Sequence, residues 1–387
     1  KYPFDINGSE FYKFPSYLKR AVIAEAIGAV SSYRSNYKNW EDNGKKGNAP
    51  TLQMDRHAMP VFYNKNTYKE DAPKNAKYPK DMNPDDDNIR WLKLYQNNDW
   101  VWIPVRLRKT DINYINKYWG ACEDKSAPTL EKIHKYYLRF SFTETVILSD
   151  TPIAEQIICA IDLGINTDAV CSIMKADGTI LARKFIDFTS DKDRMIHAMN
   201  RTRRKQSKHG PKSARGLWAY VKRLNEDRAK KISAAIVEFA SQHSVDAIVM
   251  EHLDFKGCRK RGSKAQRLSM WNHGIIREKV EQKAHLLGIR IATICAWKTS
   301  ALAFDGSGSV TREDNNHALA TFTTGKRYNC DLSASYNIGA RYFIRELLKS
   351  LPATEESRVK AKVPDVGRRT SCTLSTLRVL VKELSAA

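Results

Sequence analysis

The sequence predicts an α/β domain in the second part of the chain, preceded by a β-rich module that carries a long helix. After residue 153, short apolar strands alternate with long amphipathic helices. Two of these strands end on a carboxylate, at Asp162 and at Glu251. Between residues 50 and 152, short apolar runs are separated by polar turns, which predicts the β-rich module.

The first third of the chain contains a predicted helix and a predicted hairpin. Residues 15–43 have apolar side chains at helical spacing, and Pro15 favours the first helical turn. Apolar and aromatic residues flank a short polar turn within 91–108, which predicts two paired strands. We expect a helical segment over residues 1–49 and a β-barrel-like module over residues 50–152.

Residues 153–350 have the element order of an RNase H-like domain. The predicted elements are a strand ending at Asp162, a hairpin around Asp177-Gly178, a helix over 214–243, a strand ending at Glu251, a helix and a strand over 266–294, a Gly/Ser-rich connection over 305–327, and a helix that Asp331 opens. Residues 351–387 follow as a basic tail, which either contacts RNA or is solvated.

Asp162, Glu251 and Asp331 are the candidate catalytic residues and the candidate metal ligands. Taken singly, each has a structural explanation: a tight turn after a strand, a solvated strand end, or a helix N-cap. Together they predict a site for two divalent ions, because Mg²⁺ prefers carboxylate oxygens. Two Mg²⁺ ions, for which Mn²⁺ can substitute, would activate a water and stabilise the departing oxygen during phosphodiester hydrolysis.

The net charge predicts a polyanionic partner. The chain has 65 Lys and Arg against 43 Asp and Glu, which leaves a formal charge of +22. Nucleic acid is the usual partner of such a chain, and a generally basic or membrane-surface protein is the alternative. No apolar run approaches the ~20 residues of a membrane span. Seven cysteines without a framework spacing indicate a reducing cytoplasm.

Basic side chains gather in two stretches of the α/β domain. The first stretch, residues 201–231, would line a groove that neutralises phosphates; the alternative is that it forms a solvated helix face. The second, Arg259–Lys264, would suit a mobile lid beside the acids or an ordinary surface loop. The residues that we expect to contact nucleic acid are Arg201, Arg203, Arg204, Lys205, Lys208, Lys212, Arg215, Lys222, Arg223, Arg259, Lys260 and Arg261.

The three acidic segments resemble the split RuvC motifs of TnpB proteins and of the compact type V CRISPR nucleases. They are Ile161-Asp162-Leu163-Gly164-Ile165-Asn166, Ile248-Val249-Met250-Glu251-His252-Leu253 and Asp331-Leu332-Ser333-Ala334-Ser335-Tyr336-Asn337-Ile338-Gly339. The resemblance covers roughly residues 155–350. It implies an RNA-guided DNA endonuclease with one RuvC site, a guide RNA, and double-stranded target DNA with a short adjacent motif. It also implies that the first third is a wedge-like barrel with a helical recognition insertion.

The chain departs from the TnpB pattern over residues 298–328. TnpB proteins usually have a zinc knuckle of two Cys-x-x-Cys pairs there, whereas only the single residues Cys295 and Cys330 flank this region. Structural zinc takes four ligands, so we predict a shortened, zinc-free insertion. This departure leans toward a CRISPR effector, although the sequence does not separate a transposon-encoded protein from one.

Two other functions compete with the guided nuclease. One is an RNA-guided DNA-binding repressor without nuclease activity, and the three acids argue against it. The other is a guide-independent RuvC-like nuclease for branched DNA, which would leave the basic first third without a task.

Overall fold

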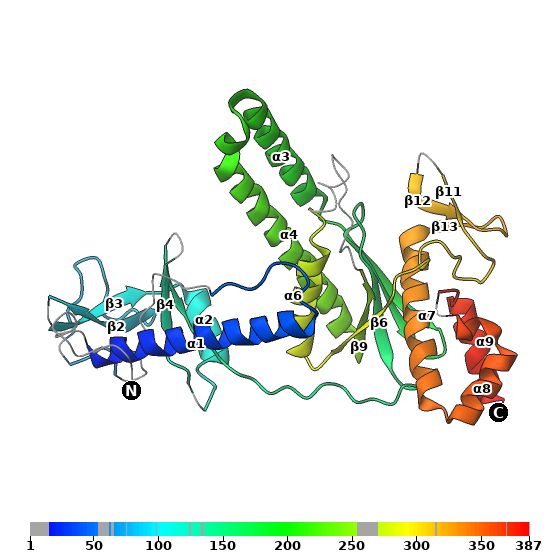
Figure 1. Cartoon of the computed structure of the whole chain (residues 1–387), viewed down its shortest axis with the longest axis horizontal. Helices are drawn as coiled ribbons and strands as arrows, with labels where there is room; N and C mark the ends of the chain where they lie inside the picture. Colours follow the sequence, from blue (N-terminus) through cyan, green and yellow to red (C-terminus); the bar gives the residue numbers. More distant parts are fainter. Residues whose placement is uncertain are drawn as a thin grey trace. The chain divides into compact units, whose positions relative to one another are not determined.

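The computed structural model describes residues 15–52, 62, 66–74, 76–97, 99–123, 125–132, 135–253, 270–313, 316–368 and 370–386. The chain divides into two compact units, residues 1–145 and residues 146–387 (Figure 1). None of the helices within these ranges is long and apolar enough to cross a membrane.

The first unit contains two helices and two small sheets. Its elements are α1 (Ser16–Asp42), β1 (Tyr68–Lys69), β2 (Ile89–Gln96), β3 (Asp99–Arg106), α2 (Lys109–Tyr118), β4 (Thr129–Lys132) and β5 (Tyr136–Arg139). The predicted long helix and the predicted hairpin are both confirmed, as α1 and as the antiparallel pair β2–β3. The core gathers around Tyr68, Leu92 and Trp119, and the Tyr68 and Trp119 rings meet edge to face at 5.7 Å.

The expected barrel is not found in the described part of the first unit. The strands form one antiparallel sheet in the order β1–β2–β3 and a separate pair, β4–β5. Closing a barrel requires every edge strand to pair. Here β1 is only two residues long, and β3 pairs with β2 alone.

The second unit contains a five-stranded sheet with helices on both faces. Its elements are β6 (Ile157–Asp162), β7 (Ala169–Lys175), β8 (Ile180–Ile186), α3 (Thr189–His209), η2 (Pro211–Ala214), α4 (Arg215–Gln242), β9 (Ala247–His252), α6 (His273–His285), β10 (Arg290–Cys295), β11 (Thr311–Glu313), β12 (Asn316–Thr321), β13 (Arg327–Asn329), α7 (Cys330–Ser350), α8 (Ala353–Lys362), η3 (Pro364–Gly367) and α9 (Leu374–Ser385).

The sheet has the strand order β10–β9–β6–β7–β8. The strands β6, β7 and β8 are antiparallel neighbours, whereas β9 and β10 add in parallel on the other side of β6. Parallel strands require crossover connections, and the helices α4 and α6 provide them. This mixed α/β topology is the one expected for an RNase H-like domain.

Alternating side chains of β6 face two different cores. Ile158 and Ala160 pack with α7, whereas Cys159 and Ile161 pack with α4 and α6. The same alternation runs through β9. At Gly339, α7 approaches the sheet so closely that an added Cβ would lie 2.9 Å from the Met174 Cε atom.

Two segments of the second unit are more ordered than the sequence predicts. The Gly/Ser-rich connection forms the antiparallel sheet β11–β12–β13 around buried Ala320 and Phe322, with the Phe304 ring 5.6 Å from Phe322. The expected basic tail instead forms α8 and α9, which belong to the core that surrounds α7. Leu374, Leu377 and Leu380 are each at most 1% exposed, so hydrophobic burial anchors this segment.

Candidate active site

The sheet brings Asp162 and Glu251 to neighbouring positions. Ile161 pairs with Met250 in the parallel ladder between β6 and β9, and the two acids are the next residue of each strand. Neighbouring strands lie about 4.8 Å apart. Since side chains alternate along a strand, both carboxylates project to the face that α7 covers.

Asp331 enters this face from the first turn of α7. The side chain of Asn329 caps the helix by accepting a hydrogen bond from the Leu332 backbone N–H at 2.9 Å. A carboxylate in the first turn is stabilised by the positive end of the helix dipole. The structure therefore places the three acids that the sequence singles out on one side of the sheet.

The three carboxylates influence one another electrostatically. Burial raises the pKa of Asp162 well above its ordinary value, and repulsion from Glu251 and Asp331 raises it further. Burial also raises the pKa of Glu251 and the pKa of Asp331. Three partly buried acids that repel one another carry an electrostatic cost that a divalent cation would relieve.

The donor chemistry fits a divalent metal, although the side chains are not preassembled. In the ranges that the structure describes, no three His, Cys, Asp or Glu side chains are grouped closely enough to hold an ion. Carboxylate oxygens are the ligands that Mg²⁺ prefers. The placement of the three acids on one face of the sheet, together with the repulsion of Asp162 by Glu251 and Asp331, is therefore what supports a metal here.

Several residues that the sequence reasoning missed support the acids. The Thr299 hydroxyl contacts the Glu251 carboxylate, and the Thr167 hydroxyl bonds with the Asp331 carboxylate. The charge of Arg312 lowers the pKa of both Asp162 and Asp331. No local sequence signal marks these residues, because each lies far along the chain from at least one acid that it serves.

Arg341 is a buried cation behind Glu251. Its side chain is 5% exposed and donates to the backbone carbonyls of Cys295, Trp297, Thr370 and Cys372 at 2.8–3.1 Å. The positive charge of Arg341 lowers the pKa of Glu251, against the effect of burial. Arg341 thus fixes positive charge near this acid while it ties α7 to two neighbouring segments.

Asn337 links the third motif to the segment that carries Thr299. Its side-chain amide donates to the carbonyls of Thr299 and Leu302 at 3.0 and 2.9 Å, and its oxygen accepts from the Leu374 N–H at 3.3 Å. Asn337 is fully buried, so these hydrogen bonds are shielded from water. The asparagine of the motif is therefore a positioning residue in this structure.

Gly164 has a steric reason to be glycine. A Cβ atom at this position would lie 2.5 Å from the backbone carbonyl oxygen of Thr167. The loop between β6 and β7 would have to open, and this would move the Thr167 hydroxyl away from Asp331.

If the three acids bind a metal, Gly164→Ala should reduce the metal-dependent activity of this site about 10- to 100-fold, the loss typical of residues that orient a metal ligand. The matched control is Gly216→Ala, because nothing lies within 4 Å of a Cβ added at Gly216. The measurement is single-turnover cleavage, with circular dichroism to compare the folded state. Equal rates for the two variants would contradict the steric role of Gly164.

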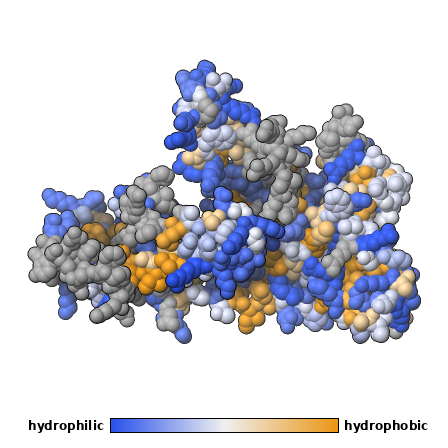
Figure 2. All heavy atoms as spheres, viewed as in Figure 1, coloured by the Kyte–Doolittle hydropathy of each residue, from blue (hydrophilic) through white to orange (hydrophobic). Residues whose placement is uncertain are grey.

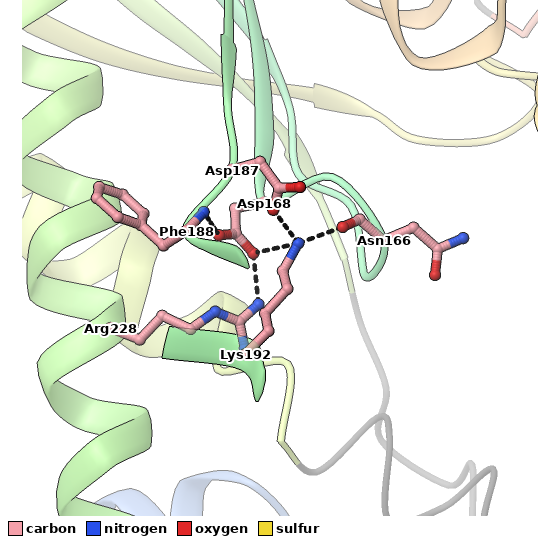
Figure 3. A network of polar contacts seen from close by, with 6 residues as sticks. All are labelled: Asn166, Asp168, Asp187, Phe188, Lys192 and Arg228. Atoms are coloured by element: carbon pink, nitrogen blue, oxygen red, sulfur yellow. Dashed lines mark hydrogen bonds and ion pairs between the residues drawn. The ribbon is translucent and has the colours of Figure 1, made fainter. Parts of the chain in front are cut away.

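A buried polar network holds the β6–β7 loop against α3 and α4 (Figure 3). The Asp168 carboxylate accepts from the Phe188 N–H at 2.9 Å, contacts the Arg228 guanidinium, and lies 3.2 Å from the Lys192 ammonium. The Lys192 ammonium also donates to the Asn166 carbonyl oxygen and contacts Asp187. The helices α3 and α4 are thereby connected to the loop that follows Asp162.

The predicted nucleic-acid contacts that the structure describes lie on one helical hairpin. α3 and α4 project together from the sheet in Figure 1, and this hairpin is mostly hydrophilic in Figure 2. Nine of the predicted residues are exposed on α3, η2 and α4: Arg201, Arg203, Arg204, Lys205, Lys208, Lys212, Arg215, Lys222 and Arg223. Arg259, Lys260 and Arg261 lie outside the described residues.

Comparison with known proteins gives one family match and a set of similar structures. The model of the Aq_aa04 family matches residues 1–96, and no curated protein matches the chain. A Cas12f1 structure with sgRNA and target DNA is 15% identical, with 86% of this chain and 76% of that chain covered and a TM-score of 0.48.

Two further structures extend the set. CasPhi-2 (Cas12j) bound to crRNA and phosphorothioate-DNA is 11% identical, with 86% of this chain and 80% of that chain covered and a TM-score of 0.48. The T. thermophilus RuvC protein in complex with a Holliday junction is 11% identical, with 50% and 96% covered and a TM-score of 0.28. The solved structures that are similar to this chain thus include both the compact type V CRISPR effectors and the RuvC fold that its three motifs resemble.

Proposed function

We propose that this chain is an RNA-guided DNA endonuclease that cuts target DNA at a single site formed by Asp162, Glu251 and Asp331. The observation that supports the proposal most strongly is geometric: the β6–β9 register makes Asp162 and Glu251 neighbours, and Asp331 lies in the first turn of α7 on the same face of the sheet. A protein has little structural use for three carboxylates that repel one another in a partly buried place. A metal-dependent reaction explains their arrangement.

The acids would hold two Mg²⁺ ions, which supply an activated water and stabilise the departing 3′ oxygen. The charges of Glu251 and Asp331 both raise the pKa of Asp162, so Asp162 is the acid that we expect to bind both ions. Thr299 and Thr167 orient Glu251 and Asp331, respectively. The exposed residue Arg312 offsets part of the negative charge of Asp162 and Asp331.

The helical hairpin of α3 and α4 would bind the nucleic-acid backbone. Its nine exposed cations can neutralise phosphates without recognising sequence. In an RNA-guided enzyme, base pairing with the guide provides the specificity, and the protein holds the duplex by its shape. The partners are therefore a guide RNA and double-stranded target DNA with a short adjacent motif, as the motif resemblance implies.

The first test is to express the protein with its native flanking DNA and to sequence the RNA that copurifies with it. A discrete RNA with a constant scaffold and a variable segment is expected, and that RNA should direct Mg²⁺-dependent cutting of a matching duplex. Random cellular RNA together with cutting by RNA-free protein would favour the guide-independent nuclease. Guided binding without cutting would favour the repressor.

We expect the double variant Arg204→Gln/Lys208→Gln to weaken nucleic-acid binding in a salt-dependent manner. Binding affinity falls as salt rises, and each lost phosphate contact reduces the magnitude of the slope of log K against log salt by about 0.7 to 0.9. The two changes together should therefore reduce this magnitude by about 1.5. The control is Lys175→Gln/Lys382→Gln, which removes two exposed cations from β7 and α9. Fluorescence anisotropy between 50 and 300 mM salt provides the slopes, and equal slopes for both double variants would remove the hairpin from the interface.

A further inference from the structure

A cavity lies beside the loop that follows Asp162. It has a volume of about 560 Å³, within the range of ligand-binding pockets. α3 forms one wall, and the loop residues Ile165 and Asn166 form another. Its lining includes the apolar and aromatic residues Met195, Ile196, Met199, Met270 and Trp271, together with Arg203. We call this cavity the methionine pocket.

The lining of the methionine pocket suits a flat, polarisable ring. Methionine side chains adapt to irregular surfaces and contact aromatic rings favourably. Tryptophan and arginine are the usual stacking partners of unpaired bases. Three methionines, Trp271 and the exposed residue Arg203 therefore form a surface with the chemistry of a base-stacking site.

Two of the three cations that line the pocket, Lys192 and Arg228, are already paired with carboxylates, so they do not favour a phosphate as the occupant. Arg228 and Lys192 line the pocket, but both contact the buried Asp168 carboxylate (Figure 3). Lys192 also contacts Asp187. A neutral ring fits this part of the lining better than an anion does, because no uncompensated charge faces the cavity from these residues.

The position of the pocket matches the path of a strand toward the acids. Ile165 follows Asp162 by three residues, which span at most about 11 Å. On the other side, α3 continues from the pocket into the exposed cations Arg204, Lys205 and Lys208. Because α3 and the loop after Asp162 both line the methionine pocket, the pocket adjoins both the helix that carries these cations and the loop that follows the acid.

We propose that the methionine pocket holds one unstacked base of the DNA strand presented to Asp162, Glu251 and Asp331. The inference deepens the proposed function and depends on it for the identity of the strand. The base would anchor the strand by stacking while the basic hairpin holds its backbone. Recognition by stacking is tolerant of sequence, which suits an enzyme whose specificity comes from a guide.

Photocrosslinking tests this proposal without using catalysis. The purified protein is mixed, in the absence of Mg²⁺, with a single-stranded DNA oligonucleotide that contains one 5-iododeoxyuridine. After irradiation, mass spectrometry identifies the attached peptides. We expect attachment at Trp271 or at one of the pocket methionines, and a fall in affinity of about tenfold when the modified nucleotide is replaced by an abasic one.

A matched pair of variants separates the pocket from the general charge of α3. Ile196 lines the pocket and is 50% exposed, so Ile196→Glu adds a carboxylate to the wall without disturbing the core. His197→Glu adds the same carboxylate one residue further along the helix, at an exposed position outside the lining. Ile196→Glu should abolish the pocket crosslink, whereas His197→Glu should retain it.

The proposal is overturned if the crosslinks map only outside the pocket, or if both variants crosslink like the wild type. An RNA oligonucleotide of the same sequence is the second arm, and pocket crosslinking of RNA alone would overturn the assignment to DNA. Asp162→Asn protein should crosslink normally. If that variant also cut DNA normally, the proposed function would fail while the methionine pocket remained.

Discussion

Asp162→Asn is expected to abolish cutting while it stabilises the metal-free protein. On the proposed two-metal mechanism Asp162 is a ligand, and its loss should lower the single-turnover rate by about a thousandfold or more, because the metal ions would lower the barrier by several kcal/mol. The same change removes one of three carboxylates that repel one another in a partly buried place. Each kcal/mol by which this change increases the free energy of unfolding should raise the melting temperature of a unit of this size by about 2–4 °C.

Metal binding gives this prediction a second readout. Mg²⁺ that binds only the folded protein raises its melting temperature by mass action, so the wild type should gain stability as Mg²⁺ is added. Asp162→Asn should gain much less. Glu238→Gln, which neutralises an exposed acid on α4, is the control and should match the wild type in both measurements. A destabilised Asp162→Asn protein that still responds fully to Mg²⁺ would contradict the metal assignment.

The acids could be identified from the sequence because each one interrupts a strong local pattern. A carboxylate at the end of an apolar strand is conspicuous at Asp162 and at Glu251. Asp331 stands at the start of a helix with a long apolar face. Strand alternation alone then predicts that the first two share one face, and the cores on the two sides of β6 agree with this.

The residues that support the acids could not be identified in the same way. Thr299 and Arg312 lie in segments without strong periodicity, and their role depends on the folding of β10–β13 around α7. Thr167 reaches Asp331 only because the loop after Gly164 turns tightly. Such contacts are set by tertiary packing, which local propensity does not encode.

The C-terminal segment is basic, but it is packed into the core. The basic residues after Ser350 suggested a solvated tail, yet the apolar residues at helical spacing in α9 are buried against α7. The spacing of Leu374, Leu377 and Leu380 was the available signal. Conversely, the exposed cations of α3 belong to a 21-residue helix that net charge alone did not reveal.

Arg228→Met is expected to have the largest effect on stability. The Arg228 side chain is 7% exposed, and it contacts the Asp168 carboxylate, which is fully buried. Removing one partner of a buried ion pair leaves an uncompensated charge and typically costs about 3–5 kcal/mol. Lys192 remains 3.2 Å from Asp168 and should keep the loss toward the lower end of that range. Urea denaturation of the full chain measures the loss.

Lys231→Met is the matched control for this prediction, because it removes a cation from the same helix one turn later. Lys231 pairs with Asp191 and Asp227, but its side chain is 43% exposed, so the loss should stay below about 1 kcal/mol. The double variant Asp168→Leu/Arg228→Met should be more stable than Arg228→Met alone, since it leaves no charge unpaired at Asp168. If Arg228→Met and Lys231→Met were equally mild, the network in Figure 3 would not be what secures the β6–β7 loop.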